Sequence, residues 1–128
     1  MGIDVEWVDK EKTILCFKYV GVWNWTEFHE NVLQANQMKD SVEHTVDHIY
    51  DVTESAPLPR GAITQFYNLR KRAHPRLGRL VLVTEDRFYM ALYNIMKKMY
   101  SDLGANFVIM LNLEEAIAEL KGNVDSVQ

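Results

Sequence analysis

The stretch Arg79–Thr84, RLVLVT in one-letter code, decides the fold because it is a nearly continuous apolar run. A strand with one wet face alternates apolar and polar residues, whereas a continuous run is typical of an interior strand in a sheet covered by helices. We therefore expect residues 79–84 to be the central strand of an α/β sheet.

Helical patterns flank this run along the chain. Before it, the segment Pro57–Gly61 breaks regular structure, and apolar residues at helical spacing then continue to Pro75. After it, Asp86 and Gly104 frame a long helix, because short carboxylates cap helix N-termini and glycine accepts the left-handed conformation at C-termini. The run at 79–84 is thus expected between two helices.

The N-terminal part predicts a hairpin, a helix and a third strand. Residues 5–8 and 13–19 are rich in β-branched and aromatic residues, and the polar residues 9–12 between them are typical of a hairpin connection. A helix follows, capped by Asn24 or Thr26 and extending to about Asp40, and residues 45–52 are expected as a strand.

The C-terminal part predicts one more strand and one more helix. Residues 106–111 are the strand, and Asn112 caps the helix after it. Because a helix lies between each pair of later strands, those strands must pair in parallel. The prediction is an α/β fold with a mixed five-stranded sheet, an antiparallel hairpin at its start and about four helices, in a single domain over residues 1–121 with a frayed tail at 122–128.

Composition and charge narrow the class of protein. A chain of 128 residues that is 48% hydrophobic and 25% charged can bury a core without disulfides or metal. The single cysteine, Cys16, lies in an apolar run, which favours a buried thiol in a reducing compartment. No signal segment or membrane span is evident, so we expect a cytoplasmic protein that does not bind membranes. The net charge of -4 disfavours nucleic acid as a partner.

Several short segments together resemble a known family. They are Trp23–Phe28 at the start of the first helix, Ile49–Val52 at the end of the third strand, Pro59–Gly61, the pair His74-Pro75, and Leu113–Ile117. With the order of elements, these segments resemble the STAS family of anti-sigma-factor antagonists, especially its small bacterial SpoIIAA-like members described as STAS/CRAL-TRIO domain proteins. The resemblance covers nearly the whole chain and implies a SpoIIAA-like fold that acts by binding.

The resemblance departs from the family at its regulatory turn. Antagonists carry a phosphorylatable serine at the start of the second helix, where this chain has Leu58-Pro59-Arg60-Gly61. An arginine stands near the place of the serine, while Thr53 and Ser55 lie upstream in what is expected to be the same loop. The predicted binding loop therefore comprises Asp51, Thr53, Ser55, Pro59, Arg60 and Gly61.

Two interpretations of this loop stay open. Helix N-termini attract anions, and Arg60 would add charge to a site outside the carboxyl ends of the strands. Alternatively, Pro59 and Gly61 only form a tight turn and Arg60 is solvated. A basic cluster at 70–79 allows the same two interpretations, an anionic partner or cations that complement a helix dipole.

The helix after residue 86 carries two apolar stripes where one would suffice for a core. Phe88, Leu92, Ile95 and Met99 form the stripe assigned to the core. The second stripe, expected to face a partner or line a pocket, comprises Tyr89, Tyr93, Met96 and Tyr100. The alternative is a broadly buried helix with tyrosine hydroxyls at its rim.

Enzyme signatures and metal sites are not expected. The chain has no Gly-rich phosphate loop, no nucleophile elbow and no paired cysteines. His44 and His48 on one strand would lie roughly 13 Å apart, too far for a shared zinc, and His29 and His74 are expected at the surface. We expect a non-enzymatic module without cofactor that associates with a protein partner or a second copy of itself. The alternative is a carrier or sensor of a small apolar or anionic ligand.

Overall fold

A computed structural model describes residues 2–70, 74–99 and 107–122 of the chain. Its strands form one five-stranded sheet in the order β1-β2-β3-β4-β5. The first pair is antiparallel and each later pair is parallel, which confirms the predicted α/β class and layout. The strands are β1 (Ile3–Trp7), β2 (Ile14–Gly21), β3 (Val46–Ser55), β4 (Leu77–Val83) and β5 (Phe107–Met110).

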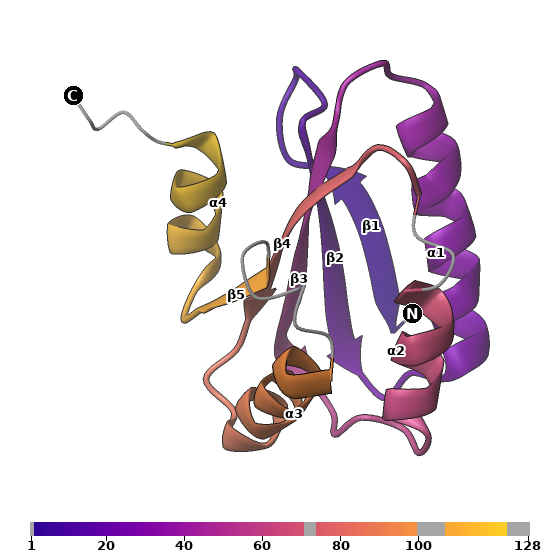
Figure 1. The fold of residues 1–128 in the computed structure, drawn as a ribbon, viewed down its shortest axis with the longest axis vertical. Helices are drawn as coiled ribbons and strands as arrows, with labels where there is room; N and C mark the ends of the chain where they lie inside the picture. Colours follow the sequence, from indigo (N-terminus) through magenta and orange to yellow (C-terminus); the bar gives the residue numbers. More distant parts are fainter. Residues whose placement is uncertain (1, 71–73, 100–106, 123–128) are drawn as a thin grey trace.

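Four helices accompany the sheet in the described residues: α1 (Trp25–Asp40), α2 (Ala62–Arg70), α3 (Arg87–Met99) and α4 (Leu113–Lys121). In Figure 1, α1 and α2 lie on one side of the sheet and α4 on the other. This division follows from the topology, since right-handed crossovers that always step in one direction place their helices on one face. The predicted helix end at Gly104 and the tail at 123–128 lie outside the described residues.

The prediction of the central strand was wrong by one position. β3, with β2 on one side and β4 on the other, occupies the centre, and β4 is the neighbour of the edge strand β5. β3 is also longer than expected, with ten residues that include Thr53 and Ser55. An interior strand is apolar on both faces whether it is central or next to the centre, so composition does not separate the two positions.

Side-chain hydrogen bonds define the ends of several elements. Asn24 accepts a hydrogen bond from the backbone N–H of Glu27, whose side chain accepts from the N–H of Asn24, a complete capping box at the start of α1. Asn112 caps α4 by accepting a hydrogen bond from the backbone N–H of Glu115. In the first hairpin, Asp9 accepts from the backbone and hydroxyl of Thr13. Local sequence therefore sets these boundaries.

The two faces of the sheet carry different cores. On the α4 side, small and aliphatic residues pack tightly around Ala116, which has no exposed surface. Cys16 belongs to this cluster, where burial and the neighbouring Asp51 raise the pKa of its thiol to about 11. On the opposite side the core is largely aromatic, with Phe17, Tyr19 and others under α1, α2 and α3. Within the described residues, aromatic rings belong to this second cluster and not to the first.

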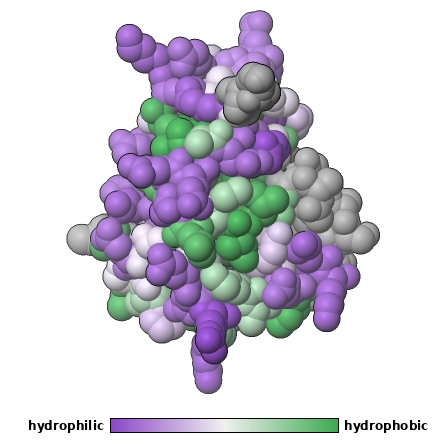
Figure 2. All heavy atoms as spheres, turned by 90° about the vertical axis from the view of Figure 1, so that its left-hand side faces the viewer, coloured by the Kyte–Doolittle hydropathy of each residue, from purple (hydrophilic) through white to green (hydrophobic). Residues whose placement is uncertain are grey.

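The described helices are all too short or too polar to cross a bilayer. Apolar side chains nevertheless reach the surface. Figure 2 shows the side that carries α3 and α4, where apolar residues lie between hydrophilic ones. The large exposed apolar side chains of this part of the chain include Phe88, Ile95 and Leu111.

Candidate functional site

A cavity of about 200 Å³ lies between the sheet and the helices of the aromatic face. α4 packs closely on β3, β4 and β5, and α1 packs on β1, whereas the backbones of α2 and α3 lie farther from the sheet. Large side chains bridge part of that distance and leave space between them. The cavity is therefore a consequence of how α2 and α3 stand over the sheet.

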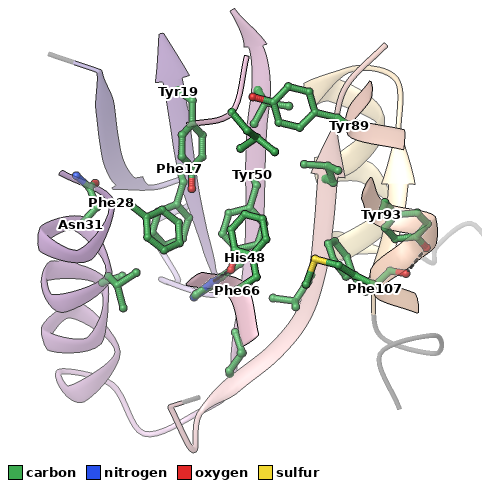
Figure 3. Close-up of a pocket in the computed structure, with 18 of the residues that line it drawn as sticks. Phe17, Tyr19, Phe28, Asn31, His48, Tyr50, Phe66, Tyr89, Tyr93 and Phe107 are labelled. Carbon is green, nitrogen blue, oxygen red and sulfur yellow. Dashed lines mark hydrogen bonds between the residues drawn. The ribbon is translucent and has the colours of Figure 1, made fainter. Parts of the chain in front are cut away.

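The sheet and the three helices on one of its faces line this cavity (Figure 3). The sheet forms the floor, α1 forms one wall, α3 the opposite wall, and Phe66 of α2 closes it from above. The lining is overwhelmingly apolar. Its residues include Phe17, Tyr19, His48, Tyr50, Val52, Leu80 and Leu82 of the sheet, Phe28, Asn31, Val32, Ala35 and Lys39 of α1, and Tyr89, Leu92, Tyr93 and Met96 of α3.

Aromatic contacts hold α2 in place above the cavity. The ring of Trp25 meets Phe28 edge-on at 5.1 Å between centroids and Phe66 edge-on at 5.7 Å. Its indole N–H donates to the backbone carbonyl of Arg60 over 2.6 Å. Trp25 thus ties the start of α1 to the loop before α2, and edge-on pairs of this kind stabilise beyond their buried area.

A line of three polar side chains crosses the apolar lining. Nζ of Lys39, in the last turn of α1, lies 2.7 Å from Nε2 of His48 on β3. Nδ1 of the same imidazole lies 2.8 Å from the hydroxyl of Tyr50. Because an ammonium only donates, His48 accepts at Nε2, carries its proton on Nδ1 and donates it to Tyr50. His48 is therefore a neutral link between the two groups.

Burial changes the proton affinity of all three groups. Lys39 is only 2% exposed, and loss of hydration lowers the pKa of its ammonium to about 8 against the opposing effect of Asp40. Burial, with Lys39 and His74 nearby, lowers the pKa of His48 well below its ordinary value. Burial also raises the pKa of Tyr50. At neutral pH the line consists of an ammonium, an uncharged imidazole and an uncharged phenol.

One further polar atom of the described lining lacks a hydrogen-bonding partner. Among the described residues, Oδ1 of Asn31 is the one buried side-chain oxygen or nitrogen without a hydrogen bond. Its amide nitrogen donates to the carbonyls of Ile3 and Glu27, so the oxygen is the free end. Among the described residues, the cavity wall thus offers one hydrogen-bond acceptor, Oδ1 of Asn31, that protein contacts leave unused.

The two predicted stripes of α3 differ from expectation at Phe88 and Ile95. Tyr89 and Tyr93 are 4% and 9% exposed and line the cavity together with Met96, whereas Phe88 and Ile95, assigned to the core, are 57% and 45% exposed. Both buried tyrosine hydroxyls have hydrogen-bond acceptors. The hydroxyl of Tyr93 donates to the carbonyl of Phe107 over 2.6 Å, and the hydroxyl of Tyr89 donates to the carbonyl of Ala56 over 3.1 Å. The assignment of Phe88 and Ile95 to the core was therefore wrong, because apolar composition alone does not decide which stripe of a helix is buried.

Tyr100 of the predicted partner face and the side chain of Met99 lie outside the described part of the structure. Tyr89, Tyr93 and Met96 line the cavity, which fits a pocket wall better than a docking surface, because the buried Tyr89 and Tyr93 are out of reach of a protein partner.

The predicted binding loop is divided among three places. Asp51 is buried on β3 beside Cys16, facing the α4 side, and accepts from the backbone N–H and hydroxyl of Thr53. Ser55, at the end of β3, accepts from the indole of Trp23 over 2.8 Å and donates to the carbonyl of Ala56. Thr53 and Ser55 are thus strand residues, contrary to the expectation of a loop, because β3 continues past residue 52.

The remaining loop residues, Pro59, Arg60 and Gly61, line a shallow surface groove. Phe88 and Ile95 of α3 form its other side. Gly61 has a φ of 84°, a conformation that favours glycine and explains this residue in the turn. Arg60 does not line the cavity and does not contact Asp51. The sequence therefore predicted one site from residues that lie apart in the structure.

The side chain of one histidine, His74, is largely buried where the sequence predicted a surface position. The side chain of His74 is 8% exposed, donates from Nε2 to Asp40 over 2.7 Å and accepts at Nδ1 from the N–H of Arg76. It lines the cavity rather than the surface, and its ring is held between the carboxylate of Asp40 and the backbone N–H of Arg76. In the described residues, no group of three His, Cys, Asp or Glu side chains could hold a metal ion. Lys71 and Arg72 of the basic cluster are outside the described residues.

Sequence reasoning did not identify Lys39, His48 and Tyr50 as site residues, although a signal was present. The apolar stripe of α1 through Phe28, Val32 and Ala35 continues four residues later at Lys39, which therefore lies on the inner face of the helix. Likewise, His48 and Tyr50 occupy the alternating positions of β3 that face the helices. A lysine at a position of the apolar stripe therefore indicated a buried charge in this part of the fold.

No protein-family model, curated protein or solved structure matches the chain. The relation to the STAS family therefore stays a prediction from the sequence.

Proposed function

We propose that this protein binds a small apolar molecule in the cavity between its sheet and the helices α1, α2 and α3, as a carrier or sensor. The observation that carries the proposal is the cavity itself, of about 200 Å³ and lined almost entirely by apolar side chains. Well-packed interiors leave few spaces larger than a water molecule, whereas a dry apolar cavity of about 150 Å³ is large enough to bind benzene.

The composition of the lining supports the same function. Ligand sites are mostly apolar and aromatic, with a few polar groups that orient the ligand. This cavity combines the rings of Phe17, Phe28 and Phe66 with the polar line from Lys39 to Tyr50. A purely structural core gains nothing from a buried lysine, because removing an ammonium from water is costly.

The proposal is tested by a substitution on α1 that places a larger side chain in the cavity. Val32 lines the cavity and its neighbour Leu33 is 62% exposed, so Val32→Phe and Leu33→Phe are a matched pair. Isothermal titration with octanamide, a neutral short-chain probe, is expected to show binding to the wild type and to Leu33→Phe. Val32→Phe is expected to weaken that binding at least tenfold while keeping a cooperative unfolding transition.

Wild-type protein that binds neither octanamide nor octanoate would refute the proposed function. So would a Val32→Phe variant that stays folded and binds as well as the wild type. Native mass spectrometry of gently purified protein adds an independent measurement, because a retained ligand appears as a mass increment that Val32→Phe loses.

A second candidate function is association with a protein at the surface groove. The groove joins Pro59–Gly61 to the outer face of α3, where Phe88 and Ile95 are exposed. Exposed apolar side chains that gather beside a groove are typical of protein contact sites. This candidate uses the two elements predicted from the sequence, the loop before α2 and the helix α3. On α3, however, the contact residues are Phe88 and Ile95 instead of the tyrosines.

Light scattering tests this candidate with Phe88→Glu and, as control, Asn94→Glu at another exposed position of α3. Association of the chain with itself predicts a dimer in the wild type and the control and a monomer in Phe88→Glu. A monomer in all three proteins would remove self-association through this groove.

A further inference from the structure

Lys39 is the one lysine, arginine, aspartate or glutamate in the described lining of the cavity. It is 2% exposed, so its ammonium has lost nearly all contact with bulk water. Its hydrogen-bonding partner is the uncharged Nε2 of His48, at 2.7 Å. The adjacent Asp40 carboxylate is instead engaged by His74, and none of the described carboxylates forms an ion pair with Lys39.

A buried cation with a neutral partner is an incomplete arrangement. Buried charges in proteins are paired or bound to an ion of opposite charge, because the cost of dehydration is otherwise uncompensated. An ammonium has three N–H donors, and one of them is used by His48. The remaining donors suit an anionic oxygen, which forms hydrogen bonds roughly twice as strong as those of neutral acceptors.

Resting on the proposed function, we propose that the ligand is a small carboxylic acid whose apolar part fills the cavity and whose carboxylate binds Nζ of Lys39. The cavity volume of about 200 Å³ limits the apolar part to a short acyl chain or a single ring. His48 and Tyr50 orient the lysine through their hydrogen bonds and stay uncharged.

The protonation state of Lys39 favours an acid over an aldehyde that would react with a free amine. Lys39 is faced by Asp40 on its own helix, His48 and Tyr50 on β3, and His74 before β4. With a pKa of about 8, the amine remains mostly protonated at pH 7. A protonated amine attracts a carboxylate and is not a nucleophile.

The experiment compares octanoate with octanamide, which have the same shape and differ in charge. Titration at pH 7 is expected to show that the wild type binds octanoate about tenfold more tightly, as follows from the greater strength of hydrogen bonds to charged groups. Lys39→Met is expected to bind both compounds with similar affinity. Lys98→Met removes a lysine at an exposed position and is expected to keep the preference.

A second arm of the experiment needs no variant. Octanoate stays ionised from pH 7 to 9.5, whereas Lys39 loses its proton over this range. The wild-type preference for octanoate is therefore expected to fall from about tenfold to nearly one, and the affinity for octanamide to stay constant.

Each outcome decides one claim. Equal binding of octanoate and octanamide by the wild type at pH 7 would overturn the acid-binding proposal and leave the cavity function standing. A preference that survives in Lys39→Met, with the variant folded, would also overturn it. Failure of both compounds to bind would instead refute the proposed function itself.

Discussion

Replacing Lys39 by methionine tests whether this ammonium is truly held in an apolar interior. Methionine has a similar length and no charge, so the substitution removes the cation with little change in volume. The expected result is a specific difference in how the stability of the two proteins depends on pH, because a buried lysine disfavours the folded state whenever it is protonated.

The magnitude follows from the pKa of Lys39, which burial lowers from 10.5 in the unfolded chain to about 8 in the folded one. At pH 7 the ammonium is charged in both states, and burial lowers the free energy of unfolding by about 3 kcal/mol. At pH 9.5 the folded state holds a neutral amine, and about 1.5 kcal/mol of that penalty remains. The stability of the wild type relative to Lys39→Met should therefore rise by about 2 kcal/mol between these pH values.

The sign is fixed by proton binding. Between about 8 and 10.5 the unfolded chain binds more protons at this group than the folded one, so stability increases with pH. The substitution also leaves Nε2 of His48 without its donor, at a cost of about 1–3 kcal/mol. That cost is the same at both pH values and does not enter the comparison.

Urea unfolding followed by tryptophan fluorescence measures the effect directly, since the chain has three tryptophans. A change of about 2 kcal/mol corresponds to roughly 1 M urea in the relative transition midpoints. Lys98→Met, at an exposed position, should follow the wild type at both pH values. Parallel pH dependence of the wild type and Lys39→Met would show that the ammonium is hydrated and would refute the reasoning.

Three other substitutions probe the site and its supports. The stability of His48→Gln should fall less than that of the wild type when the pH is lowered from 6.5 to 5. Burial lowers the pKa of His48 in the folded state, so in this pH range unfolding of the wild type takes up a proton at His48. Thermal unfolding at both pH values measures the difference. Tyr93→Phe removes the donor to the Phe107 carbonyl and should cost about 1 kcal/mol in urea unfolding, and no loss would contradict the buried hydrogen bond. Asn24→Ala removes the cap of α1 and should also cost about 1 kcal/mol, with Asn24→Gly restoring most of it.

Much of the fold was predictable because it is encoded in local chemistry. Asn24 and Asn112 cap their helices through the residue three positions later, and such bonds form within one turn whatever surrounds them. The first hairpin likewise depends on Asp9 and Thr13, four residues apart. Parallel pairing of β3, β4 and β5 then follows from the helices between them.

The orientation of α3 and the position of the central strand were not predictable in the same way. Both stripes of α3 are apolar enough to be buried, and the choice between Tyr89 and Phe88 depended on acceptors in other elements, such as the carbonyl of Ala56. The carbonyl of Phe107 plays the same part for Tyr93. Such partners are distant in the sequence and become neighbours only when the sheet has formed.

By itself, the sequence determined the order of helices and strands, the caps and the mixed sheet, because each depends on spacing and on contacts within a few residues. Only the tertiary structure decided that Lys39 and His48 meet at 2.7 Å inside a cavity, and that Arg60 lies outside it. A functional site depends on distances between elements, and those distances are set by how the helices pack over the sheet.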